Sequence, residues 1–170
     1  MRNFMSAFRK KLLAPNTMIS GVLEACSPED KKIITSIDAM RLVLRGMRDS
    51  TVYEIADEGG ITELRLYREV FRGGEVVLEL EESAAYAPAV FIELMNRCRV
   101  MRWDGFHGAH PKNVSDGIMF DFMAVVNGGQ RIRADGSENF PQGYREFVRE
   151  LNRMLAERGD RVDRGDCDGS

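Results

Sequence analysis

The sequence predicts an α+β protein with an antiparallel sheet of about six strands, helices packed on one face of the sheet and two further helices at the N-terminus. Three observations predict this class. Apolar residues recur with helical spacing near both ends of the chain and in its middle, they alternate with polar residues between those segments, and glycine pairs separate the alternating runs. Sheet strands joined by tight turns and shielded by amphipathic helices are typical of this pattern.

Length and composition indicate one globular domain. The chain has 170 residues, of which 44% are hydrophobic and 30% are charged. Its 24 basic and 27 acidic side chains give a formal net charge of −3, which provides no basic field to collect phosphates. Nucleic acid is therefore not an expected partner.

The cysteines and the N-terminus favour the cytoplasm. Cys26, Cys98 and Cys167 are far apart and form no CxxC pair, so they predict neither a disulfide framework nor a metal clamp. The basic residues 9–11 interrupt the first apolar segment before a signal peptide could form. No stretch approaches the ~18 consecutive apolar residues of a membrane span. We expect a cytoplasmic protein with reduced thiols and no cofactor.

Two helices are expected within residues 1–48. The first would run from Phe4 to Leu13, with apolar and basic residues on different faces. The second would begin at Ser27, an N-cap residue followed by Pro28 and two acidic residues that suit a first helical turn. Its apolar face would comprise Ile33, Ile34, Ile37, Met40, Leu44 and Met47.

Three strands of a meander should follow. They are expected at residues 51–57, 61–71 and 75–82. Gly59-Gly60 and Gly73-Gly74 separate them, and glycine readily adopts the positive φ angles of tight hairpins. In the third strand the residues expected to face the core are Val76, Leu78 and Leu80. The alternating glutamates would face solvent or Arg65 and Arg68 of the preceding strand.

The second half repeats this sequence of elements. A helix is expected over 88–98, then a short strand from Val100 to Trp103 and a loop from Asp104 to Ser115. A hairpin with the turn Asn127-Gly128-Gly129 would follow at 118–135. The last helix should start after a proline at position 141, with an apolar face formed by Tyr144, Phe147, Val148, Leu151, Met154 and Leu155.

These elements predict one domain over residues 1–157 and a disordered, charge-rich tail over 158–170. Within the domain, residues 51–98 and 99–157 would each form a strand-strand-strand-helix unit. The helical segments FIELMNR and FVRELNR resemble each other, which suggests a βββα pseudo-repeat. Any hairpin followed by an amphipathic helix produces a similar echo, so the duplication stays open.

The segment 103–117 concentrates the chemically distinctive residues of the chain. The candidate binding residues are Trp103, Asp104, Phe106, His107, His110 and Asp116. Aromatic and histidine side chains in one loop are types that anchor protein interfaces. Two histidines and an aspartate could instead bind a divalent metal or transfer protons. Trp103 could also simply cover the edge of the sheet, with Asp-Gly forming a turn. We assign no catalytic residue and no metal ligand.

Residues 100–157 resemble a family of small uncharacterised bacterial α+β proteins. The motifs that carry the resemblance are WDGF at 103–106, DGIMFDF at 116–122 and GSENFPQGY at 136–144. Phe120 stands where a second tryptophan is common in such proteins. The resemblance implies a bacterial source and a fold, but no activity.

Functional motifs of the common enzyme classes do not occur: GxSxG, HExxH and CxxC are missing, and neither glycine pair has the lysine of a phosphate loop. We therefore expect a non-catalytic protein-binding or regulatory module whose partner is a protein, with homo-oligomerisation open. It would use one sheet face or the Trp103 loop. The alternative is a small-ligand-binding domain or a metal-assisted enzyme that uses the 103–117 loop.

Overall fold

The computed structural model describes residues 33–47, 49–57, 61–112 and 117–162, with side chains up to residue 157. The elements in chain order are β1 (Ile37–Arg45), β2 (Ser50–Asp57), β3 (Thr62–Arg72), β4 (Glu75–Tyr86), α2 (Pro88–Arg97), the 3-10 helix η2 (Val100–Trp103), β5 (Phe106–Gly108), β6 (Met119–Val126), β7 (Gln130–Ser137) and α3 (Tyr144–Val162). None of the helices described is both long enough and apolar enough to cross a membrane.

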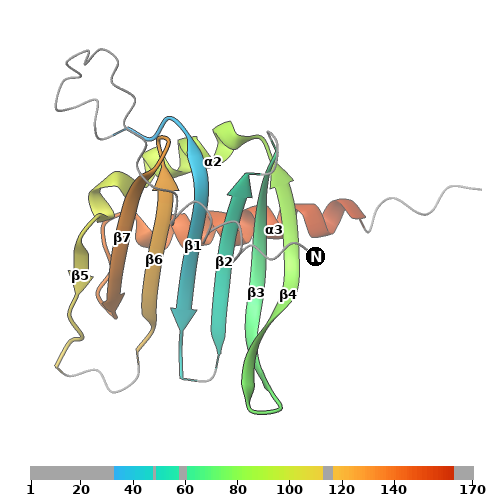
Figure 1. Cartoon of the computed structure of the whole chain (residues 1–170), viewed down its shortest axis with the longest axis vertical. Coiled ribbons are helices and arrows are strands. Elements are labelled where there is room, and N and C mark those ends of the chain that lie inside the picture. Colours follow the sequence, from blue (N-terminus) through green and yellow to red (C-terminus); the bar gives the residue numbers. More distant parts are fainter. Residues whose placement is uncertain (1–32, 48, 58–60, 113–116, 163–170) are drawn as a thin grey trace, which may run out of the picture. The chain divides into compact units, whose positions relative to one another are not determined.

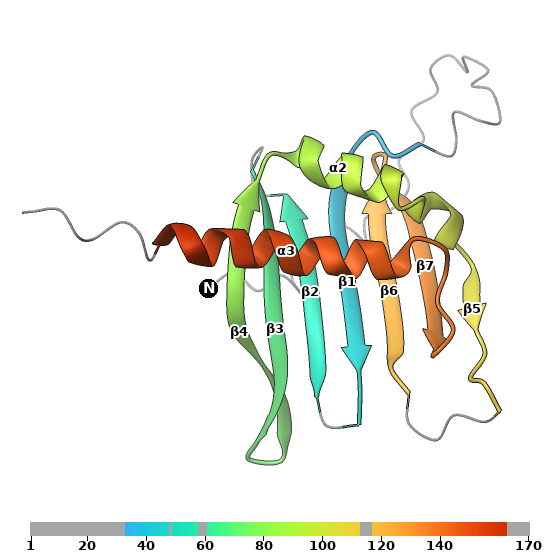
Figure 2. The same cartoon turned by 180° about the vertical axis from the view of Figure 1, so that it is seen from behind.

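The strands form one seven-stranded sheet in the order β4-β3-β2-β1-β6-β7-β5 (Figure 1). Neighbouring strands are antiparallel except β5 and β7, which are parallel. Both α2 and α3 lie on the same face of the sheet (Figure 2). The predicted fold class, an antiparallel sheet of about six strands with two N-terminal helices, is therefore wrong: the sheet is mixed and larger, and sheet dominates the structure.

Strand β1 occupies the position for which a second N-terminal helix was predicted. Met40, Leu42 and Leu44 face the two helices, whereas the intervening Val43 lies on the other face and is also buried. A strand that is apolar on both faces has no clear alternation, so its residues also fit a helical period. Pairing with β2 and β6 on its two sides decides the structure. The first predicted helix lies outside the described residues.

Two asparagines fix the chain where it enters β1. The Asn96 side chain on α2 accepts a hydrogen bond from the Ile34 N–H at 2.9 Å and donates one to the Ile34 carbonyl at 2.8 Å. The Asn127 Oδ1 atom accepts from the Thr35 N–H at 2.7 Å. Backbone groups that have no sheet partner are thus satisfied by side-chain amides.

The predicted hairpins are confirmed. Strands β2, β3 and β4 form the expected meander, and β6 pairs with β7 around the expected turn. Asn127, Gly128 and Gly129 in that turn have φ angles of 51°, 72° and 128°. Positive φ angles at successive residues are the conformation that Asn-Gly turns supply.

Both predicted units contain three strands followed by a helix, but their topologies differ, so the structure does not support a repeat. Residues Val100–Trp103 form a 3-10 helix instead of a strand, entered through Arg99 in the left-handed conformation (φ 57°). The chain then runs into β5, which pairs in parallel with β7, whereas the first half is a simple antiparallel meander. The two halves therefore have different topologies.

Close backbone approach explains why β5 can join the sheet. Gly108 on β5 and Gly136 on β7 are partners in the register. A Cβ atom at Gly108 would lie 2.1 Å from the carbonyl oxygen of Asn139, and one at Gly136 would lie 2.5 Å from it. Side chains at either position would collide with the backbone that leads into α3, so both positions need glycine.

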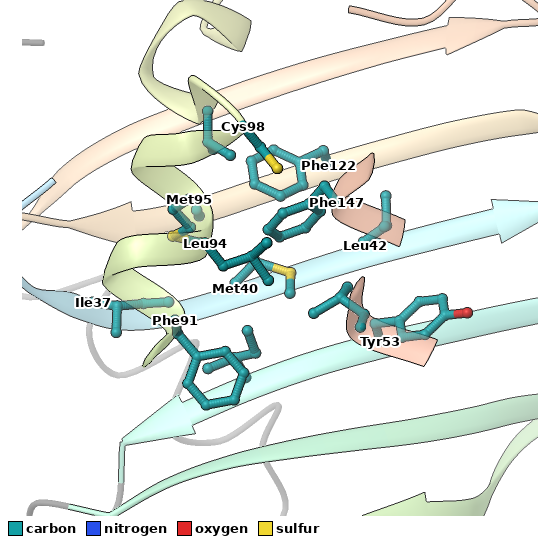
Figure 3. Packing of buried hydrophobic residues seen from close by; sticks show 14 of the residues in the cluster. Ile37, Met40, Leu42, Tyr53, Phe91, Leu94, Met95, Cys98, Phe122 and Phe147 are labelled. Atoms are coloured by element: carbon teal, nitrogen blue, oxygen red, sulfur yellow. The ribbon is translucent and has the colours of Figure 1, made fainter. Parts of the chain in front are cut away.

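The core lies between the sheet and the two helices. Met40 and Leu42 of β1 contact the layer formed by Phe91 and Leu94 of α2 and Phe147 of α3, all of which are buried (Figure 3). Burial of each such side chain stabilises the fold by about 1.5–3 kcal/mol. The helix predicted after Pro141 is confirmed as α3, which is the longer of the two helices that cover the core.

The face of the sheet opposite α2 and α3 contains a buried ionic group. Glu54 of β2 is 2% exposed and lies between its register partners Arg41 of β1 and Arg65 of β3. The Arg41 Nη1 atom is 3.0 Å from Glu54 Oε1. Burial raises the pKa of the Glu54 carboxyl, and the two guanidinium groups counteract this only in part.

We predict that Glu54→Gln removes a pH-dependent loss of stability. Because the pKa of Glu54 is higher in the folded chain than the ordinary value of 4.5, its contribution is fully present below that pH and is lost as pH rises through the folded value. Urea denaturation between pH 4 and pH 7 should show the wild type losing stability relative to the glutamine variant. Parallel stability curves for the two proteins would contradict a raised pKa.

Candidate functional site

Trp103 belongs to the core. Its side chain is 1% exposed and makes edge contacts with Phe122 and Phe147 at ring-centroid distances of 5.0 and 5.4 Å. The indole Nε1–H donates to the Gln142 carbonyl at 2.9 Å, which anchors the segment before α3. A buried tryptophan with a satisfied N–H stabilises a fold and offers no surface to a partner.

Asp104 and Phe106 also have structural contacts. The Asp104 Oδ1 atom accepts a hydrogen bond from the Arg133 N–H at 3.1 Å, so the carboxylate holds the turn against β7. Phe106 is half-buried and packs on Phe120 at a ring-centroid distance of 6.3 Å. Both residues attach the short strand β5 to the sheet.

The two histidines lie in separate polar pairs. His107 Nδ1 is 2.6 Å from Asp135 Oδ2, across the β5–β7 register, and His110 Nδ1 is 2.8 Å from Ser137 Oγ. Both histidines are exposed to solvent. Exposed pairs of this kind contribute about 0–1 kcal/mol. They connect the β5 segment to β7 at two successive points.

These pairs do not assemble a metal centre. In the described part of the chain, no three histidine, cysteine, aspartate or glutamate side chains gather closely enough to bind a metal ion. Asp116, the remaining candidate, lies outside the described residues. A histidine in contact with a serine, such as His110 with Ser137, can activate the serine hydroxyl as a nucleophile. Active sites of this kind usually exclude water, whereas His110 is exposed.

An apolar surface that sequence reasoning missed lies on the β3–β4 hairpin. Phe71, Val76 and Leu80 are 74%, 62% and 54% exposed. Phe71 and Val76 are direct cross-strand partners, and Leu80 pairs with Tyr67. With the half-buried Leu78 they share the face of the sheet that carries no described helix. We call Phe71, Val76, Leu78 and Leu80 the hairpin patch.

A β-bulge at Glu81 separates the patch from the core-facing part of β4. Leu66 pairs with Glu82 while the next residue, Tyr67, pairs with Leu80, so Glu81 is an extra residue in β4. The extra residue shifts the alternation of β4 by one, so Val76, Leu78 and Leu80 lie on the face opposite the buried Ala84, although even spacing in the sequence predicts the same face. The prediction that Val76, Leu78 and Leu80 face the core is therefore wrong. The signal in the sequence was Glu81-Glu82, where two charged residues interrupt the alternation.

Two ion pairs connect the strands of the hairpin. Arg68 Nε is 2.7 Å from Glu81 Oε1, and Arg72 pairs with Glu79. The predicted contact between the glutamates of β4 and Arg68 is thus confirmed. Arg68 and Arg72 occupy the face opposite Tyr67 and Phe71, so these ion pairs lie away from the hairpin patch, and Glu69, the register partner of Leu78, is a charged residue beside it. Figure 2 shows this end of the hairpin lying clear of both helices.

Comparison with known proteins shows no relatives. Neither a protein-family model, nor a curated protein, nor a solved structure matches the chain.

We predict that Trp103→Ala is severely destabilising whereas His107→Ala is not. Loss of a fully buried indole leaves a cavity and costs about 3–5 kcal/mol, while removal of an exposed pair costs less than about 1 kcal/mol. Urea denaturation followed by far-ultraviolet circular dichroism measures both. Equal, small losses for the two variants would show that Trp103 is a surface residue of a mobile loop.

Proposed function

We propose that the protein is a non-catalytic protein-binding module whose binding surface is the hairpin patch. The single observation that carries this is the exposure of three large apolar side chains on one face of one hairpin. Contiguous exposed apolar surface is characteristic of interaction sites. The three side chains come from paired strands, so they form a pre-ordered surface that costs little entropy to bind.

A protein is the partner that this surface fits best. The patch combines an aromatic anchor, Phe71, with aliphatic neighbours, a combination typical of the centre of protein interfaces. Three residues of the hairpin patch lie on the edge strand β4. Along that strand Glu75, Glu79 and Glu82 oppose pairing with a second copy of the same acidic strand. These charges favour a different protein over self-association through this edge.

Cys98, the one cysteine among the described residues, is not an activated nucleophile. Burial, reinforced by Glu146, raises the pKa of the Cys98 thiol to about 11, so the thiol stays protonated at neutral pH. Cys98 is free and buried in the core, which agrees with the cytoplasm as the compartment we propose.

The test is a proximity-labelling and pull-down experiment in the native host with the full chain. We expect Phe71→Asp and Val76→Asp to reduce the recovery of a specific partner at least tenfold, because each places a charge in a desolvated contact. Val77→Asp is the matched control, since Val77 is 40% exposed on the other face of the same strand. Circular dichroism should show all three variants folded.

Two results would contradict the proposal. If the proteins recovered with the wild type are recovered undiminished with both patch variants, or if Val77→Asp abolishes recovery as they do, the hairpin patch is not the binding surface.

A further inference from the structure

A second surface lies on the helix-bearing side of the sheet, away from the hairpin patch. A groove of about 490 Å³ runs beside α3 and is open to solvent. Its lining is mostly apolar and comprises Leu44, Ile118, Phe140, Tyr144 and Val148, together with Glu138, Arg145, Arg149 and Asn152. The end of β1 and the segment before β6 form one wall of the groove, and α3 forms the other. From Tyr144 to Asn152 the wall is about 12 Å long, at ~1.5 Å per helical residue.

Two arginines of the groove make no direct ion pair with a described residue. Arg145 and Arg149 are exposed on the same side of α3, one helical turn apart, and neither makes a hydrogen bond or ion pair with a described residue. The next arginine of the helix differs: Arg153 pairs with Glu150 and Glu157. Glu138, the acidic residue of the groove, already accepts a hydrogen bond from the Ile118 N–H at 2.5 Å.

The groove also contains a tyrosine hydroxyl with no partner among the described residues. Tyr144 is 5% exposed, and burial, together with the nearby Tyr53, raises the pKa of its hydroxyl. Among the residues described, this hydroxyl has no hydrogen-bond partner, whereas the Tyr53 hydroxyl donates to Asn152 Oδ1 at 2.7 Å. A neutral phenol with a free O–H is a donor for an anionic group.

We infer that this groove binds an acidic peptide segment of a partner protein, with a large apolar side chain against Phe140 and Val148 and carboxylates on Arg145 and Arg149. The inference rests on the proposed function as a protein-binding module but uses a separate surface. Arginines four residues apart on a helix are separated by about 6 Å along its axis. Alternate side chains of an extended peptide are separated by about 6.6 Å, so two such carboxylates can reach both guanidinium groups.

The shape of the groove favours a peptide over a fatty acid. Sites for small apolar ligands bury most of the ligand surface. This groove is open to solvent and carries its arginines on an exposed rim, so an acyl chain would remain in contact with water. A peptide brings its own backbone and flanking residues to cover the groove.

The test uses the full chain and an array of nine-residue peptides. Each peptide carries glutamates at two alternate positions and one of Phe, Trp, Leu or Ile beside them, and matched arrays replace the glutamates with Gln or Lys. We expect fluorescence polarisation to detect binding of acidic members only. Arg145→Glu and Arg149→Glu should each weaken binding at least tenfold and reduce its salt dependence. Arg102→Glu, an exposed charge reversal on η2, is the control.

Three results would overturn the inference. They are a wild-type protein that binds no acidic member, retention of binding by both arginine variants, and binding of decanoate, as the fatty-acid probe, without displacement by any peptide. Phe71→Asp separates this test from that of the hairpin patch, because it should bind the peptides as the wild type does. Undiminished partner recovery with Phe71→Asp would overturn the hairpin patch alone, and peptide binding that the arginine variants retain would overturn the groove alone.

Discussion

The structure depends on the pairing of β1 with strands on both of its sides. Residues 39–45 form a ladder with β2, and residues 37–45 form one with β6. The first ladder connects β1 to the meander β2–β3–β4, which is local in sequence. The second connects it to a hairpin that lies about eighty residues further along the chain. Without β1 the strands would form two separate three-stranded sheets, β4-β3-β2 and β6-β7-β5.

This central position explains which parts of the fold could be predicted from the sequence. The meander and the β6–β7 hairpin depend on local signals, since Gly73-Gly74 and Asn127-Gly128 specify their turns, and both predictions are confirmed. The strand β1 depends on partners that are distant in sequence. Its apolar residues satisfied a helical period as well as a strand period, and the tertiary pairing that decides between them leaves no local trace.

The predicted site stays a prediction, and the structure shows contacts within the fold for five of its six residues. The residues between Trp103 and His110 were predicted to form a site because their types are rare in the chain. The structure shows that Trp103 fills the core, that Asp104 and Phe106 attach β5, and that His107 and His110 connect it to β7. Rare residue types therefore marked an unusual piece of architecture, a parallel edge strand held by side chains. The exposed apolar residues of β4 are of common types. The sequence signal for their exposure is the interrupted alternation at Glu81.

The irregularity of β4 is confined to one residue, Glu81. The bulge absorbs Glu81, so Leu80 and Glu82 face opposite sides of the sheet as adjacent residues of a regular strand would. Loss of the Glu81 codon would therefore straighten β4 and leave Val76, Leu78 and Leu80 on the same face, with the same partners on β3. A lineage could lose or regain this codon while every turn and every cross-strand pair of the hairpin stayed as it was.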